Sequence, residues 1–214
     1  MRDEVYIIGG GPSIKNIDLS KLKDKDTIVV NKAILDVPNP NFFITMDYTF
    51  LKKINNNNLI NTDFVKVFIA NFTYDYIQNV DGRIVDTRFN LVYDLSDFDI
   101  IIKSYFTNGF GIRFNQFCNG NNSGFCALQL AYLLGYKKIY LLGIDLVLDG
   151  DQTHYHGGYG NSKKFKQRLP DYISNFVDGI IELKMKDNSV KLYSCSDISI
   201  LNEHIEYIKY DSAL

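Results

Sequence analysis

Short unbroken runs of apolar residues recur along the chain, and each ends in glycine or in a polar residue. Such runs are typical of strands buried on both faces of a parallel sheet, because no alternating residue faces water. They predict strands at 5–8, 27–30, 42–45, 65–70, 138–143 and 190–194. About six mainly parallel strands with helices between them predict an α/β fold, a single Rossmann-like three-layer domain over residues 1–214.

Helical periodicity separates several of these strands. After Ser123, apolar residues recur every three or four positions as far as Gly135, so the serine is placed to cap a helix and the glycine to end it. A second helix is predicted at about 162–186, and a short amphipathic helix around His204. Residues 72–105 mix Tyr, Asp and Phe without a clear period, so we expect irregular or short antiparallel structure there.

The first predicted strand runs into a turn whose backbone can approach a ligand closely. The turn consists of Gly9, Gly10, Gly11, Pro12 and Ser13. Backbone N–H groups in such a turn, with the positive end of a following helix, can bind a phosphate. The spacing matches neither G-x-G-x-x-G, since Ile14 stands where the third glycine belongs, nor the loop that needs Gly-Lys-Ser/Thr. A nucleotide or other phosphate site, and a plain tight turn in which Ser13 caps the following helix, therefore both stay open.

Polar residues directly follow other predicted strands. Asn31 comes after the second strand, Asp47 after the third and Asp145 after the fifth. The carboxyl ends of parallel strands line the ligand crevice of an open sheet, so these side chains are candidates for binding. The Asn31 amide can both donate and accept, which suits a nucleotide base or sugar. Asp47 suits the N-cap of a following helix equally well.

Titratable groups are densest after the fifth strand, in a loop at about 147–162 that we expect to form a short lid. As a catalytic loop, it would use His154 or His156 as a base, oriented by Asp149 or Asp151. As a metal site, its Asp-x-Asp and His-x-His pairs would bind Mg²⁺ or Mn²⁺. As an ordinary surface loop, it would only carry solvated charges.

Three stretches together resemble a known group of proteins: "IIGGGPSIKNIDLSKL", "IVVNKA" and "NSGFCALQLAYLLGYKKIYLLGIDL". The Gly-Pro-Ser turn, the strand ending in asparagine and the Ser-Gly helix leading to a Leu-Gly-Ile-Asp strand occur in this order in bacterial sialyltransferases of glycosyltransferase family 42. The wider Rossmann-type group includes archaeal hydroxymethylpterin pyrophosphokinases and uncharacterised bacteriophage proteins.

The resemblance implies roles for individual residues in a nucleotide-binding crevice. The turn at 9–13 and Asn31 would contact the phosphate and sugar of a donor nucleotide. Ser123 and Gly124 would lie at its base or phosphate, with Asp145 at the floor of the crevice.

Three functions of different classes stay open. The first is a nucleotide-sugar-dependent inverting glycosyltransferase of unknown donor and acceptor, for which the resemblance implies His154 as the general base. The second is a magnesium-dependent phosphoryl transferase of the pyrophosphokinase kind, where Asp47, Asp145 and Asp149 or Asp151 would hold the ion around ATP. The third is a non-catalytic nucleotide-binding protein, for instance of a phage, because the family's donor tyrosines are missing after Asp145.

Composition restricts the partners and the cellular compartment that we expect for this protein. A net charge of −2 and a pI of about 5.9 provide no global basic field for nonspecific nucleic-acid binding. Three cysteines without C-x-x-C spacing suit buried free thiols in a reducing cytoplasm. No stretch reaches the roughly 18 apolar residues of a membrane span, and the N-terminus does not resemble a signal peptide, so we expect a soluble cytoplasmic protein. Its 15 tyrosines and 15 phenylalanines suit an acceptor groove or a homo-oligomer interface.

Overall fold

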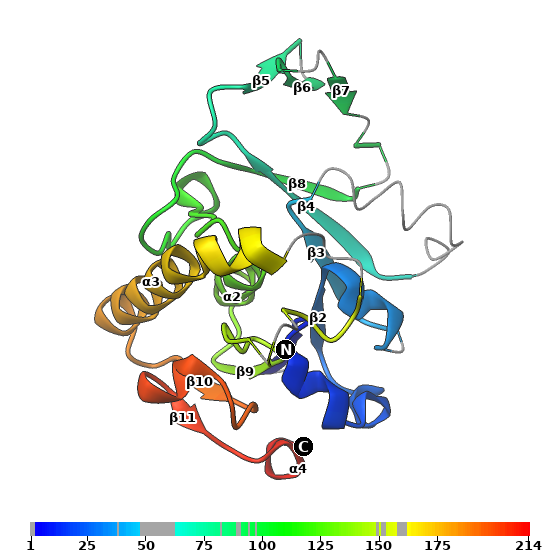
Figure 1. The fold of residues 1–214 in the computed structure, drawn as a ribbon, viewed down its shortest axis with the longest axis vertical. Coiled ribbons are helices and arrows are strands. Elements are labelled where there is room, and N and C mark those ends of the chain that lie inside the picture. Colours follow the sequence, from blue (N-terminus) through cyan, green and yellow to red (C-terminus); the bar gives the residue numbers. More distant parts are fainter. Residues whose placement is uncertain are drawn as a thin grey trace.

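The computed structural model describes residues 3–37, 39–47, 63–81, 83–88, 91–93, 95–96, 98–148, 150, 153–157 and 162–214. Within them the chain forms an eight-stranded sheet whose neighbouring strands are all parallel (Figure 1). Its strands are β1 (Glu4–Ile8), β2 (Thr27–Val30), β3 (Phe42–Thr45), β4 (Val65–Asn71), β8 (Ile100–Ser104), β9 (Lys138–Leu142), β10 (Lys191–Ser194) and β11 (Glu206–Tyr207). The predicted α/β fold with a mainly parallel sheet is confirmed.

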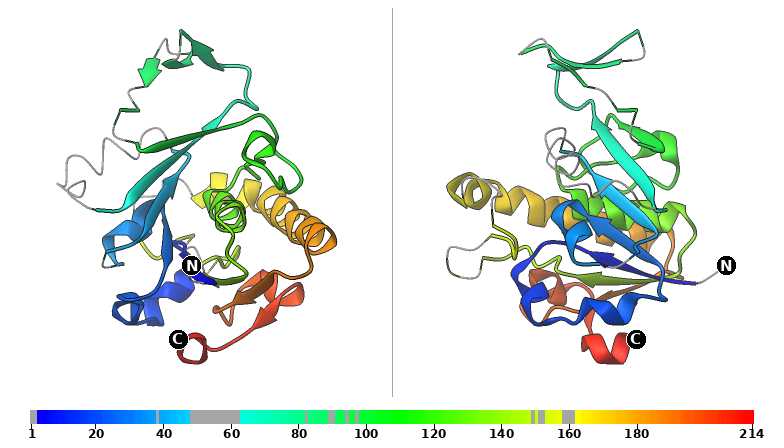
Figure 2. Two further views of the ribbon diagram at one scale, coloured as in Figure 1. Left: turned by 180° about the vertical axis from the view of Figure 1, so that it is seen from behind. Right: turned by 90° about the vertical axis from the view of Figure 1, so that its right-hand side faces the viewer.

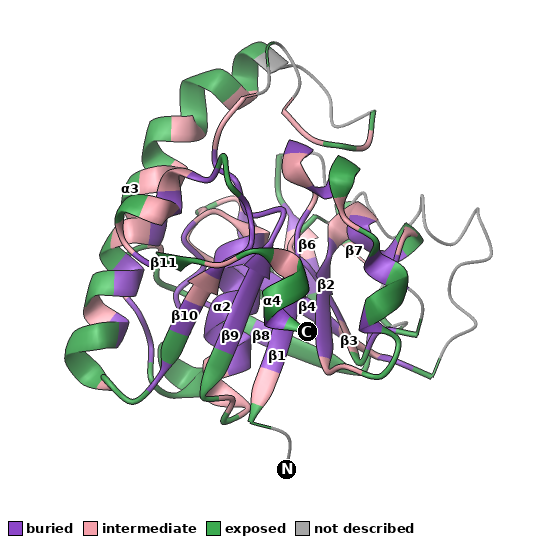
Figure 3. Ribbon diagram, turned by 90° about the horizontal axis from the view of Figure 1, so that it is seen from below, coloured by how far each residue is buried: buried purple, intermediate pink, exposed green. Residues whose placement is uncertain are grey.

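The unbroken apolar runs form the inner strands because both faces of the sheet are covered. In β1, Val5 and Ile7 belong to the core on one face, and Tyr6 and Ile8 to the core on the other; all four are fully buried. Successive side chains of a strand point to opposite faces, so a strand buried on both faces needs an apolar residue at every position. Figure 3 shows the buried residues concentrated on the central strands and on the helix packed against them.

Helices cover the two faces of the sheet (Figures 1 and 2). On the first face lie α2 (Ser123–Leu133) and α3 (Ser162–Lys186), so the predicted helix at 162–186 is confirmed. On the second lie the 3-10 helices η1 (Pro12–Asn16), η2 (Leu19–Leu22) and η3 (Asn31–Leu35), with the short helix α4 (Tyr210–Ala213). Within the described residues, no helix is both long enough and apolar enough to cross a membrane.

The cap of α2 differs from the prediction by one residue. Asn122, and not Ser123, is the N-cap: its Oδ1 accepts hydrogen bonds from the N–H groups of Gly124 at 2.8 Å and Phe125 at 3.1 Å. Ser123 already belongs to the helix, whereas the extended backbone of Asn122 lets its amide reach the first free donors. Gly135 has the left-handed φ of +91° that was predicted for the end of the helix.

Segment 72–105 contains the predicted antiparallel structure and one unpredicted strand. Its antiparallel strands are β5 (Ile77–Val80), β6 (Arg83–Asp86) and β7 (Leu91–Tyr93), which form a separate sheet beyond the ends of β4 and β8 (Figure 1). The segment then ends in β8, which joins the main sheet beside β4.

The predicted amphipathic helix around His204 is wrong. One 3-10 turn forms, η5 (Ile200–Glu203), and His204 directly follows it. The chain then extends, because Glu206 and Tyr207 pair with Tyr193 and Ser194 as the last strand of the sheet.

The three cysteines are buried free thiols, as predicted. Burial raises the pKa of Cys195 to about 12 and raises that of Cys126 as well. Thiols in such surroundings stay protonated, so these two cysteines are poor nucleophiles.

The order of the strands reverses next to β1. From β1 the chain adds β2, β3, β4 and β8 on one side, and then returns through α2 to place β9 and β10 on the other side. The loops after β1 and β9 therefore start side by side at the carboxyl edge of the sheet. From there one leads to β2 on one side and the other to β10 on the opposite side. This is the position at which open parallel sheets bind their ligands.

Candidate functional site

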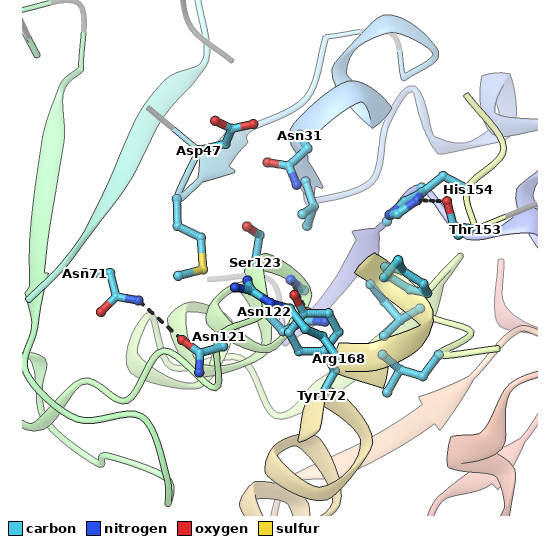
Figure 4. Close-up of a pocket in the computed structure, with 18 of the residues that line it drawn as sticks. Asn31, Asp47, Asn71, Asn121, Asn122, Ser123, Thr153, His154, Arg168 and Tyr172 are labelled. Carbon is cyan, nitrogen blue, oxygen red and sulfur yellow. Dashed lines mark hydrogen bonds between the residues drawn. The ribbon is translucent and has the colours of Figure 1, made fainter. Parts of the chain in front are cut away.

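A pocket of about 530 Å³ opens at this reversal point. It is lined by the glycine turn at 9–12, by the loop at 143–147 after β9, and by the start of α2 at 121–124. In the view of Figure 4, Asp47 and Asn31 lie on one side of the pocket and Arg168 and Tyr172 of α3 on the other, with Ser123 between them. The strand-end residues that the sequence analysis singled out are thus brought together.

The glycine turn is pressed against the loop after β9. A β-carbon at Gly9 would lie 2.5 Å from the carbonyl oxygen of Gly143, and one at Gly11 would lie 2.4 Å from Oδ2 of Asp145. The N–H of Gly9 donates to the Leu142 carbonyl and that of Gly11 to the Gly143 carbonyl, both at 2.8 Å. These glycines are therefore required for the contact between two loops, and two of the N–H groups assigned to a phosphate already have partners.

Asp145 anchors the end of the same turn. Its buried carboxylate accepts hydrogen bonds from the Ser13 N–H at 2.8 Å and from the Ser13 hydroxyl at 2.7 Å. Asp145 lines the pocket, whereas Ser13 is not among its described lining residues. The structure thus makes the pair a clamp that holds the turn in place.

Asn31 and Asp47 face the pocket from the ends of β2 and β3 (Figure 4). Asn31 has a φ of +53°, a conformation that asparagine tolerates better than most residues. Its Oδ1 accepts a hydrogen bond from the Thr45 hydroxyl at 2.7 Å, which fixes the amide and leaves its NH₂ group to donate. Asp47 donates its N–H to the same hydroxyl at 3.1 Å. The helix that Asp47 was expected to cap lies outside the described residues.

The two histidines of the lid have different surroundings. His154 lines the pocket: its Nδ1 is 2.9 Å from the Thr153 hydroxyl, and its ring packs edge-on against Phe165 at 5.2 Å between centroids. Burial, then the charges of Lys32 and His156, lower the pKa of His154 to about 4. The ring is therefore neutral at pH 7 and can accept a proton.

His156 points to η3 instead. Its Nε2 lies 2.6 Å from Oδ2 of Asp36, and His156 is not among the described residues that line the pocket. Asp149 and Asp151, which were expected to orient a histidine, lie outside the described residues. Within the described chain, no three His, Cys, Asp or Glu side chains converge as metal ligands.

Sequence reasoning missed one wall of the pocket. It is made by the segment from β4 to β7 and by α3, and its residues are Tyr74, Tyr76, Arg88, Tyr93, Arg168 and Tyr172. The signals in the sequence were the high tyrosine content and a basic run made of Lys163, Lys164, Lys166 and Arg168. These residues are brought together by the fold and not by any spacing.

Comparison with known proteins gives a match of structure and not of sequence. No family model and no curated protein matches the chain. The sialyltransferase CstII of Campylobacter jejuni, bound to the substrate analogue CMP-3FNeuAc, superposes with a TM-score of 0.56 at 22% identity, over 96% of this chain and 86% of that one. The chain has the fold of these sialyltransferases.

Two further solved structures agree. The monofunctional α-2,3-sialyltransferase Cst-I of Campylobacter jejuni gives a TM-score of 0.57 at 18% identity, covering 96% of this chain and 80% of that one. CstII in complex with a trisaccharide acceptor and CMP gives a TM-score of 0.55 at 22% identity, covering 95% of this chain and 85% of that one. The resemblance to family 42 sialyltransferases thus extends to the fold, and the likeness to pyrophosphokinases and phage proteins stays a prediction.

Proposed function

We propose that this protein is an inverting glycosyltransferase that uses a CMP-linked sugar as its donor and His154 as its general base. The observation that carries the proposal is a histidine, packed against Phe165, that lines a pocket at the reversal point of a fold shared with CMP-bound sialyltransferases. Asn31, Ser123 and Gly10 line the same pocket and would contact the nucleotide.

The reaction needs one proton acceptor and one place for a leaving phosphate. The acceptor hydroxyl attacks the anomeric carbon, the bond from that carbon to the CMP phosphate oxygen breaks, and the hydroxyl proton goes to the imidazole of His154. A ring with a pKa of about 4 is a weak base. The negative charge of a bound donor would oppose the effect of Lys32 and raise the pKa of His154 toward the range in which a base works best.

The test separates donor binding from turnover. We expect CMP to bind more tightly than UMP, AMP or GMP by isothermal titration calorimetry, and CMP-sialic acid to be consumed when saccharide acceptors are present. His154→Ala should abolish turnover and leave the Kd for CMP within about twofold, whereas His204→Ala, outside the pocket, should change neither. Failure to bind CMP, or full turnover by His154→Ala, would overturn the proposal.

The same assay addresses the two other functions. A pyrophosphokinase would need magnesium and ATP, yet the carboxylate of Asp145 already accepts two hydrogen bonds from Ser13. Activity that requires ATP and is lost in EDTA would favour phosphoryl transfer. Stoichiometric CMP binding without any product would favour a binding protein.

A further inference from the structure

A second cavity, of about 430 Å³, lies beside η1 at the carboxyl ends of β10 and β11. It is lined by residues of η1, of the loop that follows β10 and of the link from β11 to α4, and we call it the second cavity. Figures 1 and 2 show α4, in red, beside the helical turns that follow β1, in blue. A cavity of this volume is large enough for a small-molecule ligand.

The charged side chains of the second cavity favour an anion. Lys15 of η1 and Lys209 before α4 both line it, and Asp197 is the one carboxylate among its described lining residues, so two lysines less one aspartate leave a net charge of +1. Both lysines are exposed, and neither has a carboxylate partner in the part of the chain that the structure describes. The nearby Lys21, in contrast, pairs with Asp211 at 2.6 Å. Two such ammonium groups at one cavity suit a phosphate group.

The uncharged lining of the second cavity favours a ring. Tyr207 and Ile198 line it although 41% and 43% of their surfaces are exposed, and Pro12 adds a further apolar surface. Tyr210 is fixed at the cavity because its hydroxyl donates to the Asp18 carbonyl at 3.0 Å. Large apolar and aromatic side chains left open to water beside a cavity gain free energy when a ligand ring covers them.

The second cavity is connected to the first pocket through the glycine turn. Pro12 lines both. Ser13 lines the second cavity and donates two hydrogen bonds to Asp145, which lines the first pocket. A ligand in the second cavity therefore contacts the turn from the side of η1. If the ligand binds only when the turn is closed on Asp145, its binding makes opening of the turn less favourable.

We propose that the second cavity is an effector site for a small organic phosphate, and that its occupation holds the glycine turn in place. The phosphate group pairs with Lys15 and Lys209, and the ring of the ligand lies against Tyr207 and Ile198. The proposal goes beyond the proposed function and does not depend on it, because the ligand of this site takes no part in a reaction.

The first test measures binding of phenyl phosphate, which has both a ring and a phosphate group. Because the chain has no tryptophan, Tyr207→Trp places a single fluorescence reporter at the cavity, and calorimetry on the wild-type protein checks that the Kd is the same. We expect phenyl phosphate to bind more tightly than inorganic phosphate, which lacks the ring, or benzyl alcohol, which lacks the charge.

Charge variants locate the bound phosphate. Lys15→Gln and Lys209→Gln should each weaken binding of phenyl phosphate about threefold to tenfold, and Asp197→Asn should strengthen it. Lys191→Gln is the matched control, since it removes an exposed lysine of β10 that is not among the lining residues described for the cavity, and it should leave the Kd unchanged.

The second test measures the effect on the turn. By NMR, hydrogen exchange of the Ser13 amide, which donates to Asp145, should slow about tenfold when phenyl phosphate is present at ten times its Kd. The amide of Gly135, at the end of α2, should keep its rate.

Each contrary outcome overturns a stated part of the proposal. Absence of binding, or binding that Lys15→Gln and Lys209→Gln leave unchanged, would overturn the site. Weaker binding by Asp197→Asn would show that the site does not select an anion. Binding without slower exchange at Ser13 would overturn the effect on the turn. These measurements use neither CMP nor turnover, so their failure is distinct from a failure of the proposed transferase.

Discussion

Replacing His156 with alanine removes one of three contacts that hold the His154 loop in place. The first contact joins His156 Nε2 to Asp36 Oδ2 at 2.6 Å, and the second joins the Tyr155 N–H to the Gly10 carbonyl at 2.7 Å. In the third, the Lys32 ammonium donates to the carbonyl of Gly157. Because the contacts are made by the three residues that directly follow His154, they keep its ring packed against Phe165.

The size of the expected effect follows from the pKa of His154. That pKa is about 4, against 6.5 for the free side chain, and burial is the largest cause. The difference corresponds to roughly 3 kcal/mol by which the surroundings disfavour the charged ring. If His156→Ala loosens the loop and lets water reach the ring, the pKa of His154 should rise by one to two, which is roughly 1–3 kcal/mol.

NMR titration of the imidazole protons is the assay, because the chain has only three histidines. His204→Gln and His156→Gln each remove one imidazole signal, and the signal that remains in both variants belongs to His154. His156→Gln is also the matched control: it removes the imidazole, whose effect on the pKa of His154 is the smallest of the three causes, but keeps a donor for Asp36. A His154 pKa that stays near 4 in His156→Ala, or that rises equally in both variants, would refute the role of the contact.

Two further predictions concern stability. Gly11→Ala should lower the free energy of unfolding by about 1–3 kcal/mol in urea denaturation, because its β-carbon would meet the Asp145 carboxylate at 2.4 Å, whereas Gly157→Ala, with nothing within 4 Å, should change it little. Since the pKa of His154 is lower in the folded than in the unfolded chain, its contribution to stability is full above pH 6.5 and is lost as the pH falls toward 4. Between pH 7 and pH 4.5, the free energy of unfolding should therefore fall by about 2–3 kcal/mol less in His154→Gln than in the wild-type protein. An equal fall in both proteins would contradict the lowered pKa of His154.

The inner strands could be predicted from sequence because their burial on both faces demands an apolar residue at every position. Strand β8 has the same apolar character, but its exposed edge position removes that demand, and it follows a segment without period. The two-residue β11 is too short to leave a pattern, and it was predicted as helix. An edge strand is positioned by pairing with a strand that is distant in the sequence, and this pairing leaves no signal in the local pattern of residues.

The site shows the same limit at the level of single residues. Glycines at 9–11 indicated a close approach, but the sequence cannot say whether a phosphate or another part of the chain is the partner. Here the carbonyl at the end of β9 and the first carbonyl of the following loop accept two of the N–H groups. The His-x-His pair suggested one shared face on the assumption of an extended strand. Residues 153–157 are instead a series of bends, so His154 and His156 face different partners.

The two sides of the pocket are positioned by different parts of the fold, and this determines how each should respond to mutation. The glycine turn follows β1, whose Ile8 pairs with Leu142 of β9, and the Ser13–Asp145 clamp joins the two loops that follow. The opposite wall comes from Tyr93 of β7, from Tyr74, Tyr76 and Arg88 in the turns beside the antiparallel sheet, and from Arg168 and Tyr172 of α3, all outside this ladder. We therefore expect substitutions in this wall to leave the glycine turn in place, whereas substitutions at Gly11 or Asp145 should displace the turn itself.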